Sequence, residues 1–316
     1  MRVKLAVVGV GALGEQHARI YSELPEAELV AVVDIEEEKA RQVASRYSCR
    51  SYQRYEDVLD SVEAVSLAVP TREHARIGVD LLKRDVHVLV EKPIAQDLEE
   101  AELLIQAQKK SGALLQVGHS ERFNPALLAV KPFITQPKFF EAHRLAVFVP
   151  RSLDVDVILD LMIHDLDLIL HLVDSPVREV RAVGIPVLTS RIDIANARLE
   201  FENGCVANVT ASRVSRERIR KLRFFQPFEY VSIDFHKKEV EMVSLLDEAP
   251  GKQISERNFE IDQDEPLKLE LQTFLGSIQG KKPVGGEPVA CSGEEGKRAL
   301  ALALEVKSRA QSALRE

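Results

Sequence analysis

The stretch that decides the fold lies at the amino end of the chain and reads Val3-Lys4-Leu5-Ala6-Val7-Val8-Gly9-Val10-Gly11-Ala12-Leu13-Gly14. Its first part is a short apolar run, which is typical of a strand buried on both faces of a parallel sheet. Its second part has the spacing G-x-G-x-x-G and leads into a helical pattern over residues 12–23. A glycine turn between a strand and a helix is the context in which this spacing predicts a dinucleotide-binding fingerprint.

Each glycine of this motif has a physical role in that interpretation. Gly9 permits the tight turn, Gly11 lets the backbone approach a pyrophosphate, and Gly14 allows the helix to pack closely on the strand. The helix that opens at Ala12 and Leu13 offers unpaired backbone amides and the positive end of its dipole to the phosphates. We therefore expect all five residues to bind the cofactor.

The acidic residue Asp34 ends the next apolar run, residues 28–34. At that position a carboxylate accepts hydrogen bonds from the adenosine ribose and repels a 2′-phosphate. The expected cofactor is therefore NAD, with NADP less favoured. The alternative interpretation is a glycine-rich turn that holds no ligand.

Short apolar runs and helical patterns alternate as far as about residue 120. The further runs cover residues 62–70, 86–90 and 113–118, and the helical patterns cover residues 36–46, 73–84 and 97–111. This β-α order predicts a doubly wound α/β domain with a parallel sheet over residues 1–120, which is the cofactor-binding domain.

The pattern changes in residues 121–316, which we expect to form a second, α+β domain. A long helix is predicted at 155–173, followed by strand-like segments. These lie at 179–186, 192–202, 205–212, 222–225, 230–236 and 239–245. Asn203-Gly204 between two of them is a strong hairpin signal, which favours an antiparallel or mixed sheet. Two closing helices, 266–279 and 294–313, can pack back on the first domain.

Composition excludes several classes of partner. The chain has 316 residues, 45% of them hydrophobic, and a formal net charge of −8. An acidic balance disfavours nucleic acid and an anionic membrane surface as partners. No apolar run approaches the roughly 20 residues that a bilayer span needs. The three cysteines show no paired spacing, so we expect no disulfide framework, no metal site and a cytoplasmic location.

Polar residues follow two of the predicted strands, at the edge of the sheet where α/β proteins bind ligands. Thr71 can contact the cofactor or cap the next helix, and His74 can contact the cofactor or simply lie in the first turn of that helix. Glu91-Lys92-Pro93 follows the run at 86–90. We assign Glu91 and Lys92 to the cofactor site, where the ammonium of Lys92 can polarise a substrate oxygen. The alternative is a surface lysine.

Four polar residues recur on one face of the predicted long helix: Asp160, His164, Asp167 and His171. A carboxylate one turn from a histidine can orient the ring and raise its basicity, as a general base requires. We therefore assign His164 and Asp160 to catalysis and to substrate binding. A metal site on this face is a less favoured interpretation. The remaining alternative is a solvent-facing stripe on a helix capped by Asp154 or Asp156.

Two further segments supply candidate substrate ligands. Arg122 and Asn124 lie where the two domains meet in the sequence and can bind a polar substrate, although Asn124 can equally cap a helix that starts at Pro125. Residues 213–223 hold six basic residues and one acidic residue. Strand spacing would place Arg216, Arg218 and Arg220 on one face, where guanidinium groups suit a diphosphate. A charged edge strand is an equally weighted alternative.

These motifs together resemble the Gfo/Idh/MocA oxidoreductases over essentially the whole chain. The resemblance rests on Gly9–Gly14 with Asp34, on Glu91-Lys92-Pro93, and on Asp160-x-x-x-His164-x-x-Asp167. It implies a Rossmann domain followed by an open, mostly antiparallel sheet that forms homodimer or homotetramer contacts. It also implies that Lys92 and His164 contact the hydroxyl that is oxidised, with Asp160 assisting His164.

Many members of the family carry glycine two residues before the catalytic histidine, where this chain has Met162. The form Leu-Met-Ile-His-Asp-Leu-Asp is similar to members that act on UDP-linked amino sugars. The resemblance thus implies hydride transfer from a sugar or sugar nucleotide to NAD, with carbon 3 of UDP-N-acetylglucosamine as the favoured position. The alternatives are a dehydrogenase or reductase of a free sugar, an inositol or another small carbonyl compound, and a non-catalytic sensor with the same fold.

Overall fold

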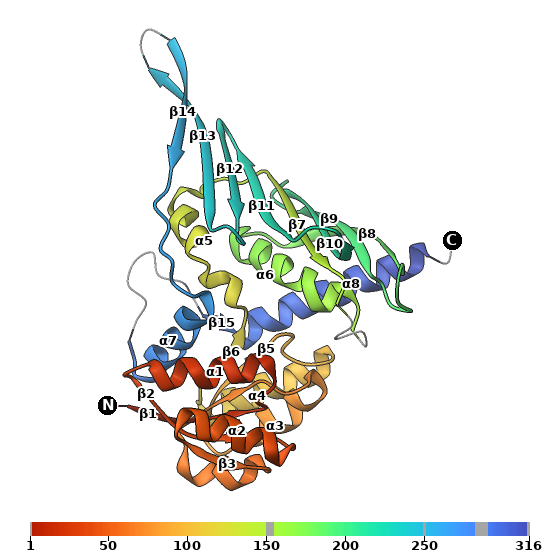
Figure 1. Ribbon diagram of the computed structural model, residues 1–316. Coiled ribbons are helices and arrows are strands. Elements are labelled where there is room, and N and C mark those ends of the chain that lie inside the picture. Colours follow the sequence, from red (N-terminus) through yellow and green to blue (C-terminus); the bar gives the residue numbers. More distant parts are fainter. Residues whose placement is uncertain (1, 150–154, 249–250, 282–289, 315–316) are drawn as a thin grey trace. The chain divides into compact units, whose positions relative to one another are not determined.

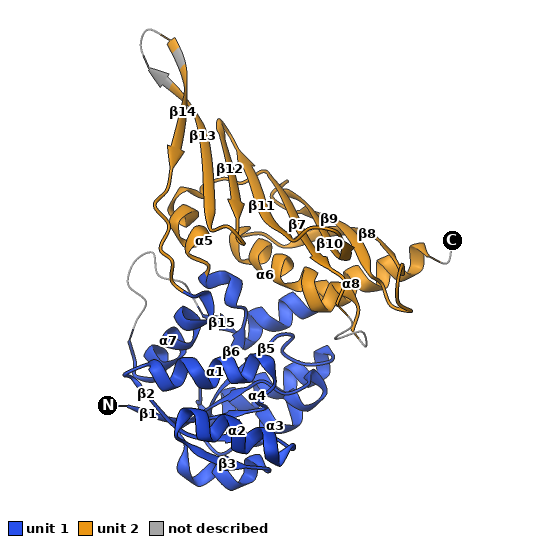
Figure 2. Cartoon of the chain, viewed as in Figure 1, with its two compact units in different colours: residues 1–123, 265–300 blue, residues 124–264, 301–316 orange. Residues whose placement is uncertain are grey.

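The computed structural model describes residues 2–149, 155–248, 251–281 and 290–314. The chain divides into two compact units, residues 1–123 with 265–300 and residues 124–264 with 301–316 (Figure 2). One crossing falls close to the expected boundary at residue 120. The chain also returns to the first unit between residues 265 and 300, which brings a helix and part of another into that unit.

The first unit is built on a seven-stranded sheet in the order β15-β6-β5-β4-β1-β2-β3 (Figure 1). The strands are β1 (Val3–Val8), β2 (Ala27–Val33), β3 (Arg50–Tyr52), β4 (Ala64–Leu67), β5 (His87–Glu91), β6 (Leu115–Gly118) and β15 (Cys291–Ser292). Every pairing is parallel except that of β15 with β6. The strand order runs outward in both directions from β1, which confirms the doubly wound Rossmann fold.

Helices connect these strands. They are α1 (Ala12–Glu23), α2 (Glu37–Tyr47), α3 (His74–Leu82), α4 (Leu98–Ser111), α7 (Pro266–Ile278) and the first part of α8 (Gly293–Ala313). Single 3₁₀ segments, η1 (Tyr55–Ser61), η2 (Thr71–Glu73) and η3 (Ser120–Phe123), link them to the strands. Tyr21 of α1 and Phe274 of α7 are buried in one core cluster with Leu5 and Leu89 of the sheet. Residues from both ends of the chain therefore complete one core.

The second unit is built on an eight-stranded sheet in the order β14-β13-β12-β11-β7-β10-β9-β8. The strands are β7 (Phe139–Val147), β8 (Val177–Ile185), β9 (Ile194–Phe201), β10 (Val206–Ser215), β11 (Ile219–Gln226), β12 (Glu229–Asp234), β13 (Glu239–Glu248) and β14 (Gly251–Asn258). Within this second sheet, β7 and β10 pair in parallel, and every other pairing of its described strands is antiparallel. This confirms a mostly antiparallel sheet. The predicted turn at Asn203-Gly204 joins β9 to β10, and Gly204 has a φ of +80°.

The helices of the second unit are α5 (Pro125–Val130), a 3₁₀ turn η4 (Lys131–Phe133), a π-helical segment η5 (Ile158–Met162), α6 (Ile163–Leu172) and the end of α8. Helix α6 packs on β7 and β10, where Phe140 and Ala142 are buried. The strands alternate between such buried residues and more exposed ones, so one sheet face carries the core of this unit. In the described part of the chain, no helix is both long and apolar enough to span a bilayer.

Candidate cofactor and catalytic site

The glycine loop closes tightly after β1. Gly9 has a φ of +86°, and a Cβ added to it would lie 2.6 Å from the carbonyl oxygen of Ala68, which follows β4. A Cβ on Gly14 would lie 1.8 Å from the carbonyl oxygen of Gly9, so α1 packs directly against the turn. Apart from its two chain neighbours, no atom of the described residues lies within 4 Å of a Cβ added to Gly11, which leaves room for a phosphate to approach the backbone. The tight turn at Gly9 and the close packing at Gly14 agree with the sequence, and the approach of a pyrophosphate to Gly11 stays a prediction.

A cavity of about 780 Å³ lies beside this loop in the first unit. Five of the expected cofactor residues line it: Gly9, Gly11, Ala12, Leu13 and Asp34. A larger, more open cavity of about 1020 Å³ is lined by Lys4, Glu28 and Arg50, at the amino ends of the strands. Ligands of open α/β sheets bind at the carboxyl ends, so we assign the cofactor to the smaller cavity.

Backbone amides hold the carboxylate of Asp34 at the rim of this cavity. Its Oδ2 accepts a hydrogen bond of 2.9 Å from the amide of Val10, and its Oδ1 accepts one of 3.0 Å from the amide of Glu36. The next side chain, Ile35, is 86% exposed. A fixed carboxylate with an apolar neighbour suits an unphosphorylated ribose.

The cations that line this cavity have acidic partners. Arg76 lies 2.9 Å from Glu73, Arg72 lies 3.8 Å from the same carboxylate, and Arg54 lies 3.6 Å from Glu56. Lys39 likewise pairs with Glu36 at 3.6 Å. Arg72 and Arg76 share the carboxylate of Glu73. The lining as a whole sets these four cations against four carboxylates, because Asp34 joins Glu36, Glu56 and Glu73, so it offers no net positive charge to a 2′-phosphate and fits NAD.

The carboxyl end of β5 carries the Glu-Lys-Pro segment, and its neighbours are buried histidines. Lys92 is half-buried and is joined to Pro93 by a cis peptide bond. The Glu91 side chain is turned into the unit, where its Oε1 lies 3.1 Å from Nε2 of His17. Glu91 is only 8% exposed, so its side chain supports the segment from within, and its contact with the cofactor stays a prediction.

His74 also has a role that differs from the expected cofactor contact. Its side chain is 1% exposed, and its ring nitrogens lie 2.9 Å from the carbonyl oxygen of Val69 and 3.0 Å from that of Pro93. A neutral ring has one N–H and donates to one of these two carbonyls, and both nitrogens are turned toward the backbone. Thr71 opens η2, and the cap positions of η2 and α3 are Pro70 and Glu73, so Thr71 is not the cap residue. Its contact with the cofactor stays a prediction.

The polar helix of the second unit begins with a π-helical turn that periodicity did not predict. The amide of Ile163 donates to the carbonyl of Ile158, five residues earlier. π-Turns occur frequently at functional sites. Asp160 and His164 are half-buried, and Asp167 is 1% exposed, so the alternative of a solvent-facing stripe is wrong.

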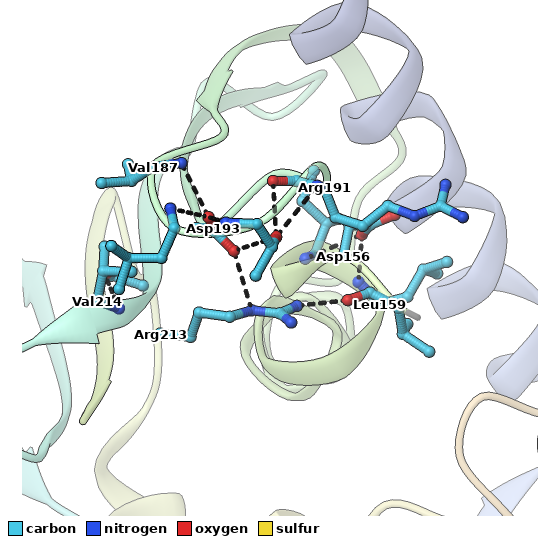
Figure 3. Close-up of polar contacts among 12 residues, drawn as sticks. Asp156, Leu159, Val187, Arg191, Asp193, Arg213 and Val214 are labelled. Atoms are coloured by element: carbon cyan, nitrogen blue, oxygen red, sulfur yellow. Dashed lines mark hydrogen bonds and ion pairs between the residues drawn. The ribbon is translucent and has the colours of Figure 1, made fainter. Parts of the chain in front are cut away.

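A buried cluster anchors the start of this helix (Figure 3). Asp193 accepts hydrogen bonds from the amides of three residues: Val187, Leu188 and Thr189. Burial opposes ionisation of Asp193, but the Thr189 hydroxyl and these amides outweigh it and lower the pKa to about 2. Arg213 lies 3.8 Å from the carboxylate of Asp193 and donates to the carbonyl of Val155 at 2.6 Å. The segment that leads into the helix is therefore fixed by a charged pair.

Asp156 completes that anchor. Its Oδ1 accepts from the amides of Ile158 and Leu159, and its Oδ2 lies 2.8 Å from Nζ of Lys307. Capping by Asp156, which belonged to the alternative interpretation of this helix, is therefore present, while Asp154 lies outside the described residues.

Two of the expected substrate ligands are structural. Arg122 is 3% exposed and pairs with Glu295 at 2.9 Å. Asn124 is 4% exposed, and its Oδ1 accepts from the amide of Ala126, which makes it the cap of α5 with Pro125 in the first turn. Both assignments to the substrate are corrected, because burial and these contacts occupy the side chains.

The basic stretch is not one strand. Strand β10 ends at Ser215, β11 begins at Ile219, and Arg216 and Arg218 lie exposed in the connection between them. Arg220 alone of the three lies in β11, where its backbone lies opposite that of Arg144 in the register with β7. The expected common face does not exist, because a turn interrupts the alternation. A role of Arg216 and Arg218 toward a diphosphate stays a prediction.

Sequence reasoning did not identify His17 or Ser66, which form a buried contact behind the Glu-Lys-Pro segment. The Nδ1 of His17 lies 2.7 Å from Oγ of Ser66. The available signal was a histidine one turn after Gly14 in an otherwise amphipathic helix. Such a histidine says nothing of its partners until the strands are placed.

Comparison with known proteins identifies the family. The model described as "Oxidoreductase family, NAD-binding Rossmann fold" matches residues 3–119, and "GFO/IDH/MocA C-terminal domain" matches residues 136–225. The chain is 37% identical to a UDP-N-acetylglucosamine 3-dehydrogenase of Acidithiobacillus ferrooxidans, over 97% of each protein. It is 26% identical to a myo-inositol 2-dehydrogenase of Thermotoga maritima, over 96% of this chain and 95% of that protein.

Solved structures agree with this assignment. The structure of the UDP-N-acetylglucosamine 3-dehydrogenase GnnA from A. ferrooxidans superposes with a TM-score of 0.91 at 36% identity, covering 99% of each chain. A levoglucosan dehydrogenase in complex with NADH shares the fold, with a TM-score of 0.86 at 18% identity over 99% of this chain and 98% of that one. The cavity, the glycine loop and these matches lead to one conclusion: the chain belongs to the Gfo/Idh/MocA family of NAD-binding oxidoreductases.

Proposed function

We propose that this protein is an NAD-dependent dehydrogenase that oxidises the C3 hydroxyl of UDP-N-acetylglucosamine to a ketone. The observation that carries the proposal is the 37% identity over 97% of the chain to an enzyme of that activity. The cavity beside the glycine loop and the carboxylate of Asp34 support it from the cofactor side. The half-buried Lys92 and His164 support it from the chemical side.

The chain's residues divide the work as follows. The amides of the glycine loop bind the pyrophosphate, and Asp34 binds the ribose hydroxyls. When bound, NAD supplies the acceptor for the hydride at its nicotinamide ring. Lys92 donates a hydrogen bond to the substrate oxygen, and His164 takes the hydroxyl proton while Asp160 holds its ring. The hydrogen on C3 leaves as hydride with the electron pair of the C–H bond. The electron pair of the O–H bond forms the second bond of the new carbonyl, and the hydroxyl proton passes to His164.

We also propose that the enzyme is a cytoplasmic homodimer or homotetramer built through the open sheet face of the second unit. Several apolar side chains of this sheet are exposed: Val183 at 48%, Ile185 at 49%, Leu245 at 36% and Ile254 at 75%. Val183 and Ile185 alternate with Gly184, whose added Cβ would meet Ala310 of α8, so they lie on the sheet face away from that helix. Val183 and Ile185 lie on the edge strand β8, and Leu245 and Ile254 lie on β13 and β14 at the other edge of the sheet. Exposed apolar side chains at such positions are typical of an interface.

The test is a substrate screen with the purified protein. The protein is incubated with NAD or NADP and one of four compounds: UDP-N-acetylglucosamine, UDP-N-acetylgalactosamine, free N-acetylglucosamine or myo-inositol. Each reaction is run with and without a hydrazine that traps a ketone. We expect NADH formation with UDP-N-acetylglucosamine, increased by the trap, and much less with NADP. Faster turnover of myo-inositol would assign the chain to the inositol dehydrogenases that it also resembles. Tight NADH binding with no turnover of any compound would favour a sensor.

A further inference from the structure

The ring of His17 joins three elements inside the first unit. It lies on α1 with no exposed surface. Its Nδ1 is 2.7 Å from Oγ of Ser66 on β4, and its Nε2 is 3.1 Å from Oε1 of Glu91 on β5. Helix α1 is the helix that the glycine loop opens, so one buried side chain connects that loop with the end of β5.

The carboxylate that His17 contacts is confined on its other side by β6. A Cβ added to Gly118 would lie 2.8 Å from Oε1 and 3.0 Å from Oε2 of Glu91. The absence of a side chain at Gly118 therefore makes room for the carboxylate next to the strand. The side chain of Glu91 is held between a ring and a backbone, and Lys92 follows it directly.

A second buried histidine holds the other neighbour of Lys92. The ring of His74 lies 3.0 Å from the carbonyl oxygen of Pro93 and 2.9 Å from that of Val69. Ser66, the partner of His17, belongs to β4, and Val69, the partner of His74, follows β4. Both histidines therefore tie the Glu-Lys-Pro segment to the same strand end.

We propose that His17 and His74 are positioning residues for Lys92, the first through the side chain of Glu91 and the second through the carbonyl of Pro93. Together they fix the direction of the Lys92 ammonium relative to the glycine loop. A catalytic group must be held to within a fraction of an ångström, and rigid neighbours do this without contacting the substrate. The inference rests on the proposed function in taking Lys92 as the group that contacts the substrate oxygen.

Two substitutions at His17 separate its two contacts. In His17→Asn the amide reaches the place of Nδ1 and keeps the contact with Ser66, but it is too short to reach Glu91. In His17→Gln the amide extends toward the place of Nε2 and can donate to Glu91. We expect His17→Asn to lower kcat at least about 10-fold while KM for the sugar nucleotide and Kd for NADH change less than about threefold. His17→Gln should recover most of kcat.

The double variant His17→Asn/Glu91→Gln tests whether the two residues act as one unit. We expect it to be no slower than the slower single variant, because both changes break the same contact. Should His17→Asn fail to fold, Glu91→Gln, which has almost the shape of the native side chain, tests that contact by itself. Equal losses in kcat and in NADH affinity would show a structural role and overturn the proposal.

A second measurement needs no substrate. The NADH-loaded protein is methylated with formaldehyde and a borohydride, and its peptides are then analysed by mass spectrometry. This gives the rate of methylation at Lys92, and the exposed Lys83 is the internal control. We expect the Lys92 rate to change severalfold in His17→Asn and to be close to native in His17→Gln, with Lys83 unchanged. Identical Lys92 rates in all three proteins would overturn the inference. If the native protein turns over no UDP-sugar, the proposed function fails, and this arm still decides the positioning role.

Discussion

Lys92 and His164 carry the chemistry of the proposed reaction, and each lies in a different compact unit. Neither side chain lines the cavity beside the glycine loop, so we expect their contributions to be separable from cofactor binding. For Lys92→Met and His164→Gln we expect kcat to fall about 10²–10⁴-fold, the range that positioned acid–base groups supply. NADH affinity, measured by fluorescence titration, should stay within a few-fold of native. Native kcat in either variant would contradict the assigned role.

His74 predicts a pH dependence of stability. Burial lowers its pKa, although the carbonyls of Val69 and Pro93, the backbone at Ile94 and the charge of Glu91 oppose this. The folded ring therefore stays neutral at a pH where the unfolded ring is protonated, so the unfolded state binds more protons. The free energy of unfolding should fall as the pH drops below about 6.5.

His74→Gln is the matched control for this dependence, because its amide does not titrate. Denaturant unfolding between about pH 7.5 and about pH 5.5 should show a smaller loss of stability in the variant than in the native protein. Parallel pH profiles for the two proteins would remove His74 as the cause.

At the scale of elements, the sequence predicted the parallel strands best. The runs at β1, β2, β4, β5 and β6 are mostly apolar and mostly buried, because both faces of a parallel sheet are covered. Strand β14 was missed because Gly251–Asn258 contains a single large apolar residue, Ile254, and that one is exposed. The pattern of β14 therefore carries no buried face that could reveal it.

The candidate site was predictable where chemistry follows a local motif and not where it depends on packing. The glycine loop, Asp34 and the position of Lys92 at a strand end all follow from short segments. The burial of Arg122 and Asn124 does not, because their partners lie far away or depend on where a helix begins. The turn at Arg216 and Arg218 lacks glycine, proline and asparagine, and its one turn-forming residue, Ser215, is a weak signal, although its hydroxyl accepts from the amide of Glu217.

The cluster that anchors the start of the helix with Asp160 and His164 gives a prediction for stability. Asp193 is fully buried and satisfies three backbone amides as well as pairing with Arg213. Asp193→Ala leaves those amides and that guanidinium without the acceptor. We expect the free energy of unfolding to fall by about 3 kcal/mol, as when one partner of a buried pair is removed.

Asp193→Asn is the informative comparison, since it keeps the shape and one acceptor oxygen. In chemical denaturation, Asp193→Asn should lower the free energy of unfolding clearly less than Asp193→Ala does. Equal and small losses would mean that the loop at 187–193 is held by other contacts.

At the scale of the whole molecule, the chain passes between its units three times, and sequence analysis anticipated one boundary. The return of residues 265–300 is decided by packing, since Leu271 and Phe274 of α7 share a core cluster with Tyr21 of α1. Contacts between residues so far apart in the chain leave no local pattern. The two closing helices were expected to pack back on the first domain, and α7 with the first part of α8 lies in that unit, while the rest of α8 belongs to the second unit.

The exposed apolar side chains of the open sheet face predict an oligomer that a charged substitution on this face dissociates. Ile254 is 75% exposed and neighbours Leu245 across the β13–β14 pair. A charge at that position would be buried without a partner in an assembled interface. Light scattering coupled to size exclusion should show a homodimer or homotetramer for the native protein and smaller particles for Ile254→Lys. A native monomer would contradict the proposed assembly.

The central claim is hydride transfer from C3 of a UDP-linked amino sugar to NAD, and isotope transfer tests it most directly. UDP-N-acetylglucosamine that carries deuterium at C3 is incubated with the enzyme, NAD and a ketone trap, and the NADH formed is analysed by mass spectrometry. The account predicts that the deuterium appears in the NADH and disappears from the trapped sugar. Unlabelled NADH, or a sugar that retains its deuterium while NADH forms, would contradict it.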